Sequence, residues 1–419
     1  MRLSCLVALC AIAALPLPVA AESPGTTYTI EELTSIARSV HPTLAAVEAG
    51  IEQAQGALRQ ARAYPNPGFA LSGGRGKPRE GGGSRSESSF ELVQPIELPG
   101  VRKWRARVTE LGLDGAKLER AVAGSVIDAA VARLAYTVLA ERRRVEVASE
   151  SARVAGRLHD FLARRVELGE SSPLEAVKAR TEWFARRREA LDAMGAFDAA
   201  RSALDLFCGR RLGARYEVID APEPALPSEL PDDLVERMRA GNPVLARAEA
   251  AVRRAAAGIE SEGKATLPQI DIFAGHDTEL DRTSTNVGVG LRIPLWDRNR
   301  GAVDAAAASR RRAAHEKDAL SVELETELSR AATEYRRARA ALKLHAEGWT
   351  AAAEESLRIA TFSFESGEAP LFDVLDAQRS NLEVQLAETD AWTALRLART
   401  EIERLIGGPI DLETSHESH

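Results

Sequence analysis

The sequence predicts a mainly α-helical protein with a small β part, built from two copies of one unit. Alanine, arginine, glutamate and leucine dominate its 419 residues and only 5% are aromatic, a composition typical of long helices. Apolar and small residues alternate at spacings of three and four over long stretches, which indicates coiled-coil helices. Four segments also recur in the same order about two hundred residues later, and such self-similarity determines the architecture.

The repeat consists of four pairs of similar segments. They are VHPTLAAVEAGIEQA and GNPVLARAEAAVRRA, AYPNPGFALSGG and TLPQIDIFAGHD, VQPIELPGVRKWR and LRIPLWDRNRGAV, and LGESSPLEAVKAR and SGEAPLFDVLDAQR. One match could arise by chance, but four in one order indicate a tandem duplication. The predicted units are residues 22–215 and 232–410, joined by a linker at 216–231 and followed by a disordered tail at 411–419.

Residues 1–21 have the features of a cleaved signal peptide. A positively charged start precedes the apolar run LVALCAIAAL, which is too short to span a bilayer, and the segment ends in the small-residue pattern VAA. Cleavage after Ala21 predicts an exported protein. Neither Cys5 nor Cys10 lies in a lipobox, so no lipid anchor is expected. Cys208 is then the single remaining cysteine, which excludes an internal disulfide framework.

Charge and motifs exclude several classes of function. The formal net charge is −7, with basic and acidic residues interspersed, which argues against nucleic acid as a partner. No run of eighteen apolar residues follows the signal peptide, so no transmembrane helix is expected. The segment GRGKPREGGG lacks P-loop spacing, and no catalytic triad, carboxylate pair or CxxC motif occurs. We therefore expect neither enzyme activity nor a cofactor.

Apolar periodicity predicts six helical regions. Two of them are far longer than a compact domain needs, because at about 1.5 Å per residue each forms a rod on the order of 100 Å. These two are residues 100–168 and 299–366. The complete set is about residues 30–62, 100–168, 171–208, 232–264, 299–366 and 370–407.

Two β-hairpins are predicted between the helices, at about residues 67–97 and 268–294. Alternation is strictest in VGVGLRI, where apolar side chains alternate with glycine and Arg292. Segments of about ten residues, apolar on one side and polar on the other, are what a transmembrane β-strand requires, and Arg292 would then face the lumen. Proline stops both helices and ladders, and it marks the four junctions, at Pro65, Pro95, Pro268 and Pro294.

Four strands cannot seal a membrane-spanning sheet. An open edge would leave backbone groups unsatisfied in hydrocarbon, and outer-membrane barrels have at least about eight strands. The chain must therefore oligomerise, and three copies would supply twelve strands. The sequence therefore requires that several copies close one barrel, but it does not fix the number of copies.

The signal peptide, the doubled helix–hairpin–helix unit, the proline-bounded strands and the echoed turns resemble the outer-membrane efflux protein family, typified by TolC. The resemblance covers essentially the whole mature chain. VQPIELPGVRKWR, the compact length and the missing lipobox are most similar to the cobalt–zinc–cadmium (CzcC-like) branch. The resemblance implies a homotrimer with a 12-stranded barrel in outer-membrane lipid and an α-helical barrel in the periplasm. It also implies that residues 100–168 and 299–366 are uninterrupted, while 30–62 stacks on 171–208 and 232–264 stacks on 370–407.

The same resemblance implies a passive exit duct in the outer membrane of a Gram-negative bacterium. Its partners would be a periplasmic adaptor, or membrane fusion protein, and an inner-membrane pump of the resistance–nodulation–division (RND) type. Heavy-metal cations are the expected cargo. Organic toxicants and type I protein secretion are alternative uses of the same duct. A soluble periplasmic adaptor or scaffold is a different class, which two helical hairpins and two β-insertions fit badly.

The last pair of echoed segments is predicted to form two helical tips, at about residues 168–174 and 366–371. Gly169 and Gly367 end the outgoing helices. Ser171 or Ser172 is expected to cap the return helix, with Pro173 in its first turn and Pro370 in the same position of the second tip. By resemblance these tips form the entrance and contact the adaptor, through Gly169, Glu175, Arg180, Phe364, Gly367 and Arg379.

LFDVLDAQR is similar to the family's tip motif, and it assigns acidic entrance rings to Asp373 and Asp376. Their spacing of three places both carboxylates on one helix face, and stacked acidic rings favour cations. The alternative is an ordinary solvated face of an amphipathic helix. Arg180 and Arg379, taken as equivalent positions of the two tips, either bind the adaptor or form ordinary helix salt bridges.

In TolC-like proteins, polar links between neighbouring tips latch the closed entrance. Glu175 keeps the acidic residue of that pattern, but Phe364, Ala369 and Leu174 stand where tyrosine, arginine and threonine are expected. These departures remove hydrogen-bond donors, so a latch of that form is not expected here.

The histidines do not predict a metal site. His416 and His419 lie in the C-terminal tail, where metal binding is an alternative to an unstructured end. His345 lies on a coiled-coil seam, and we expect it to be packed rather than to bind a metal.

Overall fold

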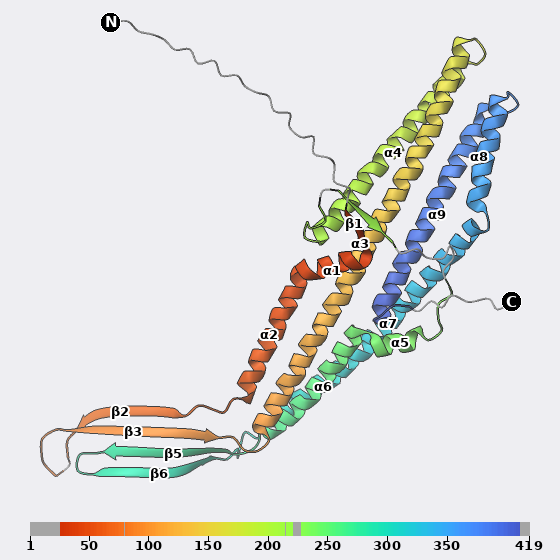
Figure 1. Cartoon of the computed structure of the whole chain (residues 1–419). Coiled ribbons are helices and arrows are strands. Elements are labelled where there is room, and N and C mark those ends of the chain that lie inside the picture. Colours follow the sequence, from red (N-terminus) through yellow and green to blue (C-terminus); the bar gives the residue numbers. More distant parts are fainter. Residues whose placement is uncertain (1–25, 79, 214, 221–227, 411–419) are drawn as a thin grey trace, which may run out of the picture.

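The computed structural model describes residues 26–78, 80–213, 215–220 and 228–410. A four-stranded sheet lies at one end of an elongated molecule, and two helical hairpins form the other end (Figure 1). The predicted signal peptide and the C-terminal tail, with His416 and His419, lie outside the described residues. Helices and strands alternate as the duplication predicts. The elements are β1 Thr26–Thr29, α1 Ile30–Val40, α2 Pro42–Arg62, β2 Gly68–Gly76, β3 Arg85–Ile96, α3 Val101–Glu167, α4 Pro173–Phe207, β4 Tyr216–Ile219, α5 Leu234–Gly241, α6 Pro243–Lys264, β5 Gln269–Thr278, β6 Thr283–Arg292, α7 Arg300–Ala346, α8 Trp349–Glu365 and α9 Leu371–Ile406.

In each repeat the shorter helices pack along one long helix, which is α3 in the first repeat and α7 in the second. In the first repeat, α2 and α4 both pack along α3, one below the other (Figure 1). In the second repeat, α6 and α9 both pack along α7, and α9 continues along α8. Contacts of α3 with α6 and α9 join the two repeats. The mainly helical fold, the internal duplication and the stacked short helices are therefore confirmed.

Of the described helices, α3 is the one long and apolar enough to cross a membrane by length and composition, with an 18-residue window of mean hydropathy 1.5. Of that window, 44% is buried inside the chain. Ile127, Val131 and Ala135 of α3 are almost fully buried in the core of the first repeat. This packing is that of a core helix.

The prediction of one uninterrupted helix over residues 299–366 was wrong. Helix α7 ends at Ala346 and α8 begins at Trp349, with Gly348 between them at φ 112°. Glycine adopts this conformation readily because it has no Cβ, and it is a poor helix former. The rod of the second repeat therefore has a break that α3, which runs through 67 residues, does not have.

The predicted helices 30–62 and 232–264 are each split in two as well. The breaks fall at His41 and Asn242, whose ψ angles are 123° and 118°, and each residue precedes a proline. Proline disfavours helical geometry in the residue before it. Both residues then cap the next helix, because His41 Nδ1 accepts from Thr43 N at 3.3 Å and Asn242 Oδ1 accepts from Val244 N at 2.9 Å.

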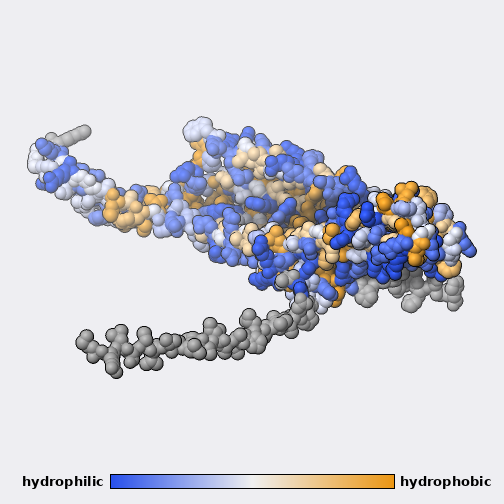
Figure 2. Space-filling model, turned by 90° about the horizontal axis from the view of Figure 1, so that it is seen from above, coloured by the Kyte–Doolittle hydropathy of each residue, from blue (hydrophilic) through white to orange (hydrophobic). Residues whose placement is uncertain are grey.

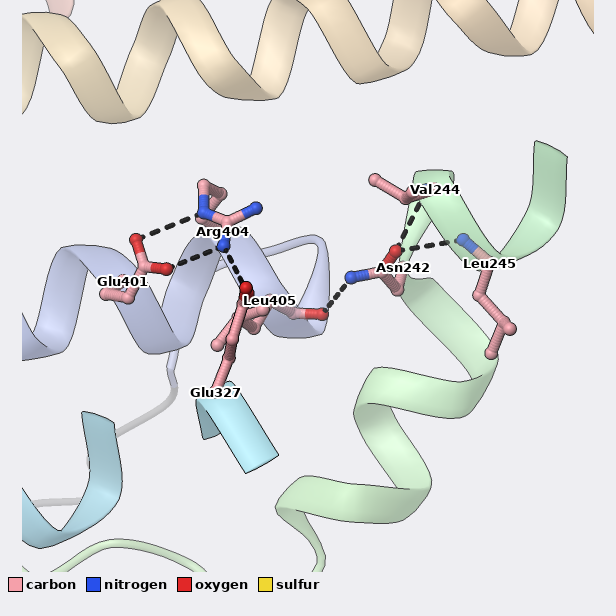
Figure 3. Close-up of polar contacts among 7 residues, drawn as sticks. All are labelled: Asn242, Val244, Leu245, Glu327, Glu401, Arg404 and Leu405. Atoms are coloured by element: carbon pink, nitrogen blue, oxygen red, sulfur yellow. Dashed lines mark hydrogen bonds and ion pairs between the residues drawn. The ribbon is translucent and has the colours of Figure 1, made fainter. Parts of the chain in front are cut away.

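In the second repeat the break is clamped onto the end of α9 (Figure 3). Asn242 is 2% exposed, and its Nδ2 donates to Leu405 O at 2.8 Å. Arg404 donates to Glu401 at 2.6 Å and to Glu327 of α7 at 3.1 Å. One buried amide and one arginine therefore tie α6, α7 and α9 together.

Two glycines allow a close backbone approach at the same place. A Cβ on Gly241 would lie 2.3 Å from Ile406 O, and one on Gly407 would lie 2.2 Å from Gly241 O. In the first repeat, Gly209 at φ 67° occupies the corresponding place, but a Cβ there would meet the Val40 side chain at 3.0 Å. Glycine is required at both junctions, and the backbone contact is tighter in the second.

Strands β1 and β4 form a small parallel sheet at the waist of the molecule that the sequence did not predict. Tyr216 and Val218 of β4 are buried in the core of the first repeat with Leu33 of α1. A separate core fills the second repeat around Tyr335. Trp392 of α9 packs against both cores and so connects the two repeats.

The larger sheet has the strand order β2-β3-β5-β6 and is antiparallel throughout, which confirms both predicted hairpins. Pro65, Pro268 and Pro294 flank strands as predicted, but Pro95 lies within β3, opposite Asp271. Proline is tolerated there because the ladder to β2 ends two residues earlier, at Val93. Gln94 Nε2 donates to the carbonyls of Pro65 and Pro95, at 3.1 and 2.9 Å, which ties this junction together.

Candidate functional site at the sheet and the helical tips

One face of the sheet is apolar and exposed. Directly paired residues of antiparallel strands lie on the same face, so the register assigns each side chain. Leu71, Val287 and Val289 of this face are 71%, 77% and 70% exposed, and Figure 2 shows hydrophobic colour on the part of the sheet near the helices. The apolar side chains that share the face are Phe69, Leu71, Phe90, Leu92, Ile96, Ile270, Ile272, Val287, Val289 and Leu291.

The opposite face is mainly polar. Arg292 Nη1 donates to its cross-strand partner Gln269 at 2.7 Å, and Ser72 and Ser89 share a hydroxyl hydrogen bond of 2.6 Å. The charged side chains of this face are Arg85, Glu87, Glu91, Asp271, Asp277 and Arg292. Glu87, Asp271 and Asp277 of this face are half-buried, whereas most apolar side chains of the other face are exposed, which is the reverse of a soluble sheet.

Both edges of the sheet are open. Strands β2 and β6 each pair with one neighbour, and no other strand of the described residues bonds to their outer edges. They present 9 and 10 residues of unpaired backbone, respectively. Such edges are templates for pairing with another chain.

At the far end of the molecule, both helical tips turn through the same backbone hydrogen bonds. In each tip the glycine N–H donates to the carbonyl three residues earlier at 3.0 Å, and the next N–H donates to the carbonyl five residues earlier at 2.8 Å. The glycines are Gly169 at φ 75° and Gly367 at φ 80°. This arrangement is a Schellman C-cap, and it confirms the prediction that the two glycines end the outgoing helices.

The return helices begin differently in the two tips. Ser172 caps α4: its hydroxyl accepts from Leu174 N, and Glu175 accepts from Ser172 N, both at 3.3 Å, which is a capping box. The carboxylate of Glu175 is therefore engaged within its own turn. Pro370 is itself the N-cap of α9, without a side-chain hydrogen bond, so the prediction that it lies in the first helical turn was wrong.

Phe364 lies between the two tips rather than on their surface. It is 5% exposed and belongs to an apolar cluster with Leu158 and Leu162 of α3, Ala179 of α4, and Leu371 and Val374 of α9. Phe161 contacts it edge-on, with ring centroids 6.2 Å apart. The ring that replaces the expected tyrosine thus joins the two hairpins by packing.

Asp373 and Asp376 are exposed near the start of α9. Among the described residues neither carboxylate forms an ion pair. Asp373 lies in the first helical turn, where a negative charge also favours the helix dipole. The two carboxylates are therefore available at the tip surface, on one face of the helix.

The tips superpose with an offset of 198 residues, since Gly169 matches Gly367 and the N-cap Ser172 matches Pro370. With this offset Arg180 matches Gln378 rather than Arg379, so the predicted equivalence of the two arginines was wrong by one residue. Gln378 is 2% exposed and donates to Ser151 O at 3.2 Å. Arg180 and Arg379 are both exposed.

The family model described as outer membrane efflux protein matches residues 33–210 and 234–408, which include both helical layers, both hairpins and both tips. The chain belongs to the outer membrane efflux protein family. The two matched segments coincide with the two structural repeats. The one-sided sheet and the paired tips are therefore features of an efflux-family fold.

Named relatives cover most of the chain. The cobalt-zinc-cadmium resistance protein CzcC of Cupriavidus metallidurans is 28% identical over 392 residues, which are 93% of this chain and 92% of that protein. The nickel-cobalt-cadmium resistance protein NccC of Alcaligenes xylosoxydans is 27% identical over 304 residues, which are 68% of this chain and 64% of that protein.

Solved structures confirm the fold. The structure of CusC aligns with a TM-score of 0.78 at 19% identity, covering 94% of this chain and 98% of that one. The outer membrane protein VceC of Vibrio cholerae aligns with a TM-score of 0.76 at 18% identity, covering 91% and 97%. This efflux-family chain therefore has the TolC-like channel fold.

His345 of this efflux-family chain is packed, as predicted. It is 7% exposed, its Nδ1 lies 2.9 Å from Thr350 Oγ1, and its ring lies 4.7 Å from that of Trp349. Within the part of the chain that the structure describes, no group of three or more His, Cys, Asp or Glu side chains is placed to hold a metal ion.

Two exposed aromatic residues at the sheet junctions were missed in the sequence. Trp296 is 93% exposed just after Pro294, and Tyr64 is 70% exposed just before Pro65. The guanidinium of Arg102 lies 3.6 Å above the Tyr64 ring. Their position next to the junction prolines could have identified them in the sequence.

Proposed function

We propose that this chain is the outer-membrane exit duct of a tripartite efflux system. Three copies close a 12-stranded barrel by pairing β6 of one copy with β2 of the next, and the helices continue as a tube into the periplasm. The observation that carries the proposal is the one-sided sheet. Its apolar face is exposed, its other face is polar and both edges are open, which only a lipid environment and closure with other copies satisfy.

The tips supply the periplasmic entrance and the surface for the adaptor. Leu168, Leu174 and Phe372 are 72%, 60% and 71% exposed around the two turns, and clustered exposed apolar groups favour contact with another protein. We propose that a periplasmic adaptor docks here and couples the duct to an inner-membrane RND pump. The duct itself is passive, because its residues form a conduit and a gate rather than a reaction site.

Heavy-metal cations are the proposed cargo. The names of CzcC and NccC, which refer to resistance to such metals, support this assignment. The polar face of the sheet, which becomes the lumen, carries Glu87, Glu91, Asp271 and Asp277 against Arg85 and Arg292. Asp373 and Asp376 add negative charge at the other end of the conduit. Rings of carboxylates favour cations over anions.

The test is deletion in the native host with sensitivity measured for zinc, cobalt, cadmium, nickel, copper and common dyes. Loss of tolerance to the metals is expected, and wild-type protein restores it. Loss of tolerance to dyes alone would move the cargo to organic compounds, and loss of protein secretion alone would assign a secretion duct.

A second arm tests the acidic entrance. Purified trimers in planar bilayers are expected to pass cations in preference to anions, and Asp373→Asn with Asp376→Asn is expected to reduce that preference severalfold. Asp192→Asn with Asp198→Asn on α4 removes the same charge away from the tips and is the matched control. An equal reduction in both double variants would assign the effect to net charge and reject the entrance rings.

A further inference from the structure

The apolar face of the sheet, here called the lipid-side face, consists of rows of side chains. Each row contains residues paired directly across the strands, and successive rows are two residues apart. Four successive rows carry the apolar side chains of the exposed face, interrupted by Gln94, His276 and Thr285. The rows are Ile96, Ile270 and Leu291; Gln94, Ile272 and Val289; Phe69, Leu92, Ala274 and Val287; and Leu71, Phe90, His276 and Thr285.

The apolar band has a defined boundary at the end next to the helices. Ile293 continues the apolar alternation beyond β6 and is 54% exposed. Tyr64 and Trp296 follow at the two junctions. Exposed tyrosine and tryptophan are characteristic of membrane–water interfaces. With Ile293 the band spans about nine residues, which matches a tilted transmembrane strand.

The boundary at the free end is polar. The fifth row consists of Gly73, Ser88, Thr278 and Thr283, and the sixth pairs Arg75 with Ser86. Figure 2 shows hydrophilic colour over this end of the sheet. Arg75 therefore stands on the lipid-side face, in the second row beyond the band, and Lys77 follows two residues later. Both are exposed, and neither forms an ion pair within the described residues.

Glu87, the carboxylate that the register places closest to Arg75, is on the other face. Glu87 pairs opposite Gly74, and its Oε1 lies against Gly76, so it belongs to the lumen side. Arg85 is also on the lumen side and donates to Leu280 O at 2.9 Å. Charge is thus sorted at the rim, with Arg75 directed outward and Glu87 directed inward.

We propose that Arg75 and Lys77 bind the phosphate groups of phosphorylated glycolipids in the outer leaflet of the membrane. Guanidinium binds phosphate through paired charge-assisted hydrogen bonds, and cations just beyond a hydrophobic span are attracted to anionic headgroups. The trimer carries three such sites, and they fix the depth of the barrel together with Tyr64 and Trp296. This inference rests on the proposed outer-membrane function.

The experiment uses the purified full-length trimer in detergent, titrated with bis-phosphorylated lipid A and read by native mass spectrometry. In the double variant Arg75→Gln with Lys77→Gln, lipid A binding is expected to weaken roughly 30-fold at low salt, from about fivefold per lost charge. The matched control is Arg85→Gln with Arg292→Gln, which removes the same charge from the lumen face. Its lipid A binding is expected to stay within about twofold of wild type.

Unchanged binding in the Arg75 and Lys77 variant would overturn the inference, as would an equal loss in the control. Full competition by millimolar inorganic phosphate would overturn it too, since the rim would then be a site for free anions rather than for lipid. Insertion of wild type and variants into phosphatidylcholine nanodiscs is measured in parallel. Failure of wild type to insert rejects the proposed function itself, whereas normal insertion with unchanged lipid A binding rejects only this inference.

Discussion

The two repeats build the same turn and the same hairpin, but they differ in the residues around them. Both tips keep the glycine C-cap with identical hydrogen bonds. The first repeat has an unbroken rod, a serine capping box and Lys178. The second has a rod broken at Gly348, a proline cap and, 198 residues after Lys178, Asp376. The backbone geometry of the tips is therefore shared, while surface charge and the continuity of the rod have diverged.

This comparison assigns different tasks to the halves. Asp373 and Asp376, the proposed acidic entrance residues, belong to the second hairpin alone, since the first offers Glu175, which is used in its own cap, and Lys178. The break in the rod lies in the same half. The second hairpin packs against the first repeat through Phe364.

The largest expected effect comes from Phe364→Ala. Removing a buried ring that joins the hairpins should cost about 3–5 kcal/mol of unfolding free energy, measured by denaturant unfolding in detergent. Val166, the matching position of the first tip, is only half-buried, so Val166→Ala should cost about 1 kcal/mol. Equal costs would contradict the asymmetry between the tips. Phe364→Tyr retains the aromatic ring and most of its packing between the hairpins. This variant should therefore keep most of the stability that Phe364→Ala loses.

The next largest difference in stability is expected between the glycine junctions at Gly241 and Gly209. Gly241→Ala forces a Cβ against Ile406 O and should destabilise the fold by about 3 kcal/mol. Gly209→Ala meets a side chain that can move, and its left-handed φ should cost about 1–2 kcal/mol. Gly258→Ala in α6, where a Cβ meets nothing within 4 Å, is the control and should be neutral or slightly stabilising. A milder effect for Gly241→Ala than for Gly209→Ala would reverse the comparison.

A smaller effect is expected at the first tip. Ser172→Ala removes the cap of α4 and should cost about 1 kcal/mol, with faster amide hydrogen exchange confined to the start of that helix. Ser171→Ala leaves the cap intact and should have no such effect. Identical exchange in the two variants would show that the capping box does not hold this turn.

The smallest effect on stability concerns Cys208, which matches Ile406 of the second repeat. Burial, followed by the nearby Asp205 charge, raises the pKa of the Cys208 thiol to about 11. At pH 8 only about one thiol in a thousand is then ionised, so alkylation of the folded mature protein should be about 100-fold slower than in urea. Because the folded pKa is raised, this contribution to stability is present below the unfolded pKa and is lost as pH rises towards about 11. Rapid alkylation of the folded protein would contradict the buried position.

The sequence predicted the features that local patterns determine. Strand faces followed from a period of two, and the tips followed from Gly169 and Gly367, because each requires only neighbouring residues. The breaks at His41 and Asn242 were missed although Pro42 and Pro243 signal them, since apolar periodicity continues on both sides of each break.

Other features depend on contacts distant in the sequence. Pairing of β1 with β4 joins residues about 190 apart, and four-residue strands give little periodicity. Phe364 could be recognised as a departure from the family pattern, but its burial depends on how the second hairpin lies on α3 and α4. Arg180 was matched to Arg379, one residue too far, because the two segments were aligned by sequence similarity. The turn geometry, which sets the offset of 198 residues, was not known from the sequence.

The most direct test of closure of the sheet between copies is the mass of the detergent-solubilised, membrane-extracted protein, corrected for bound detergent. The account predicts a mass three times that of the mature chain, together with a β-sheet signal that survives extraction. A monomer released from cells without detergent would contradict it.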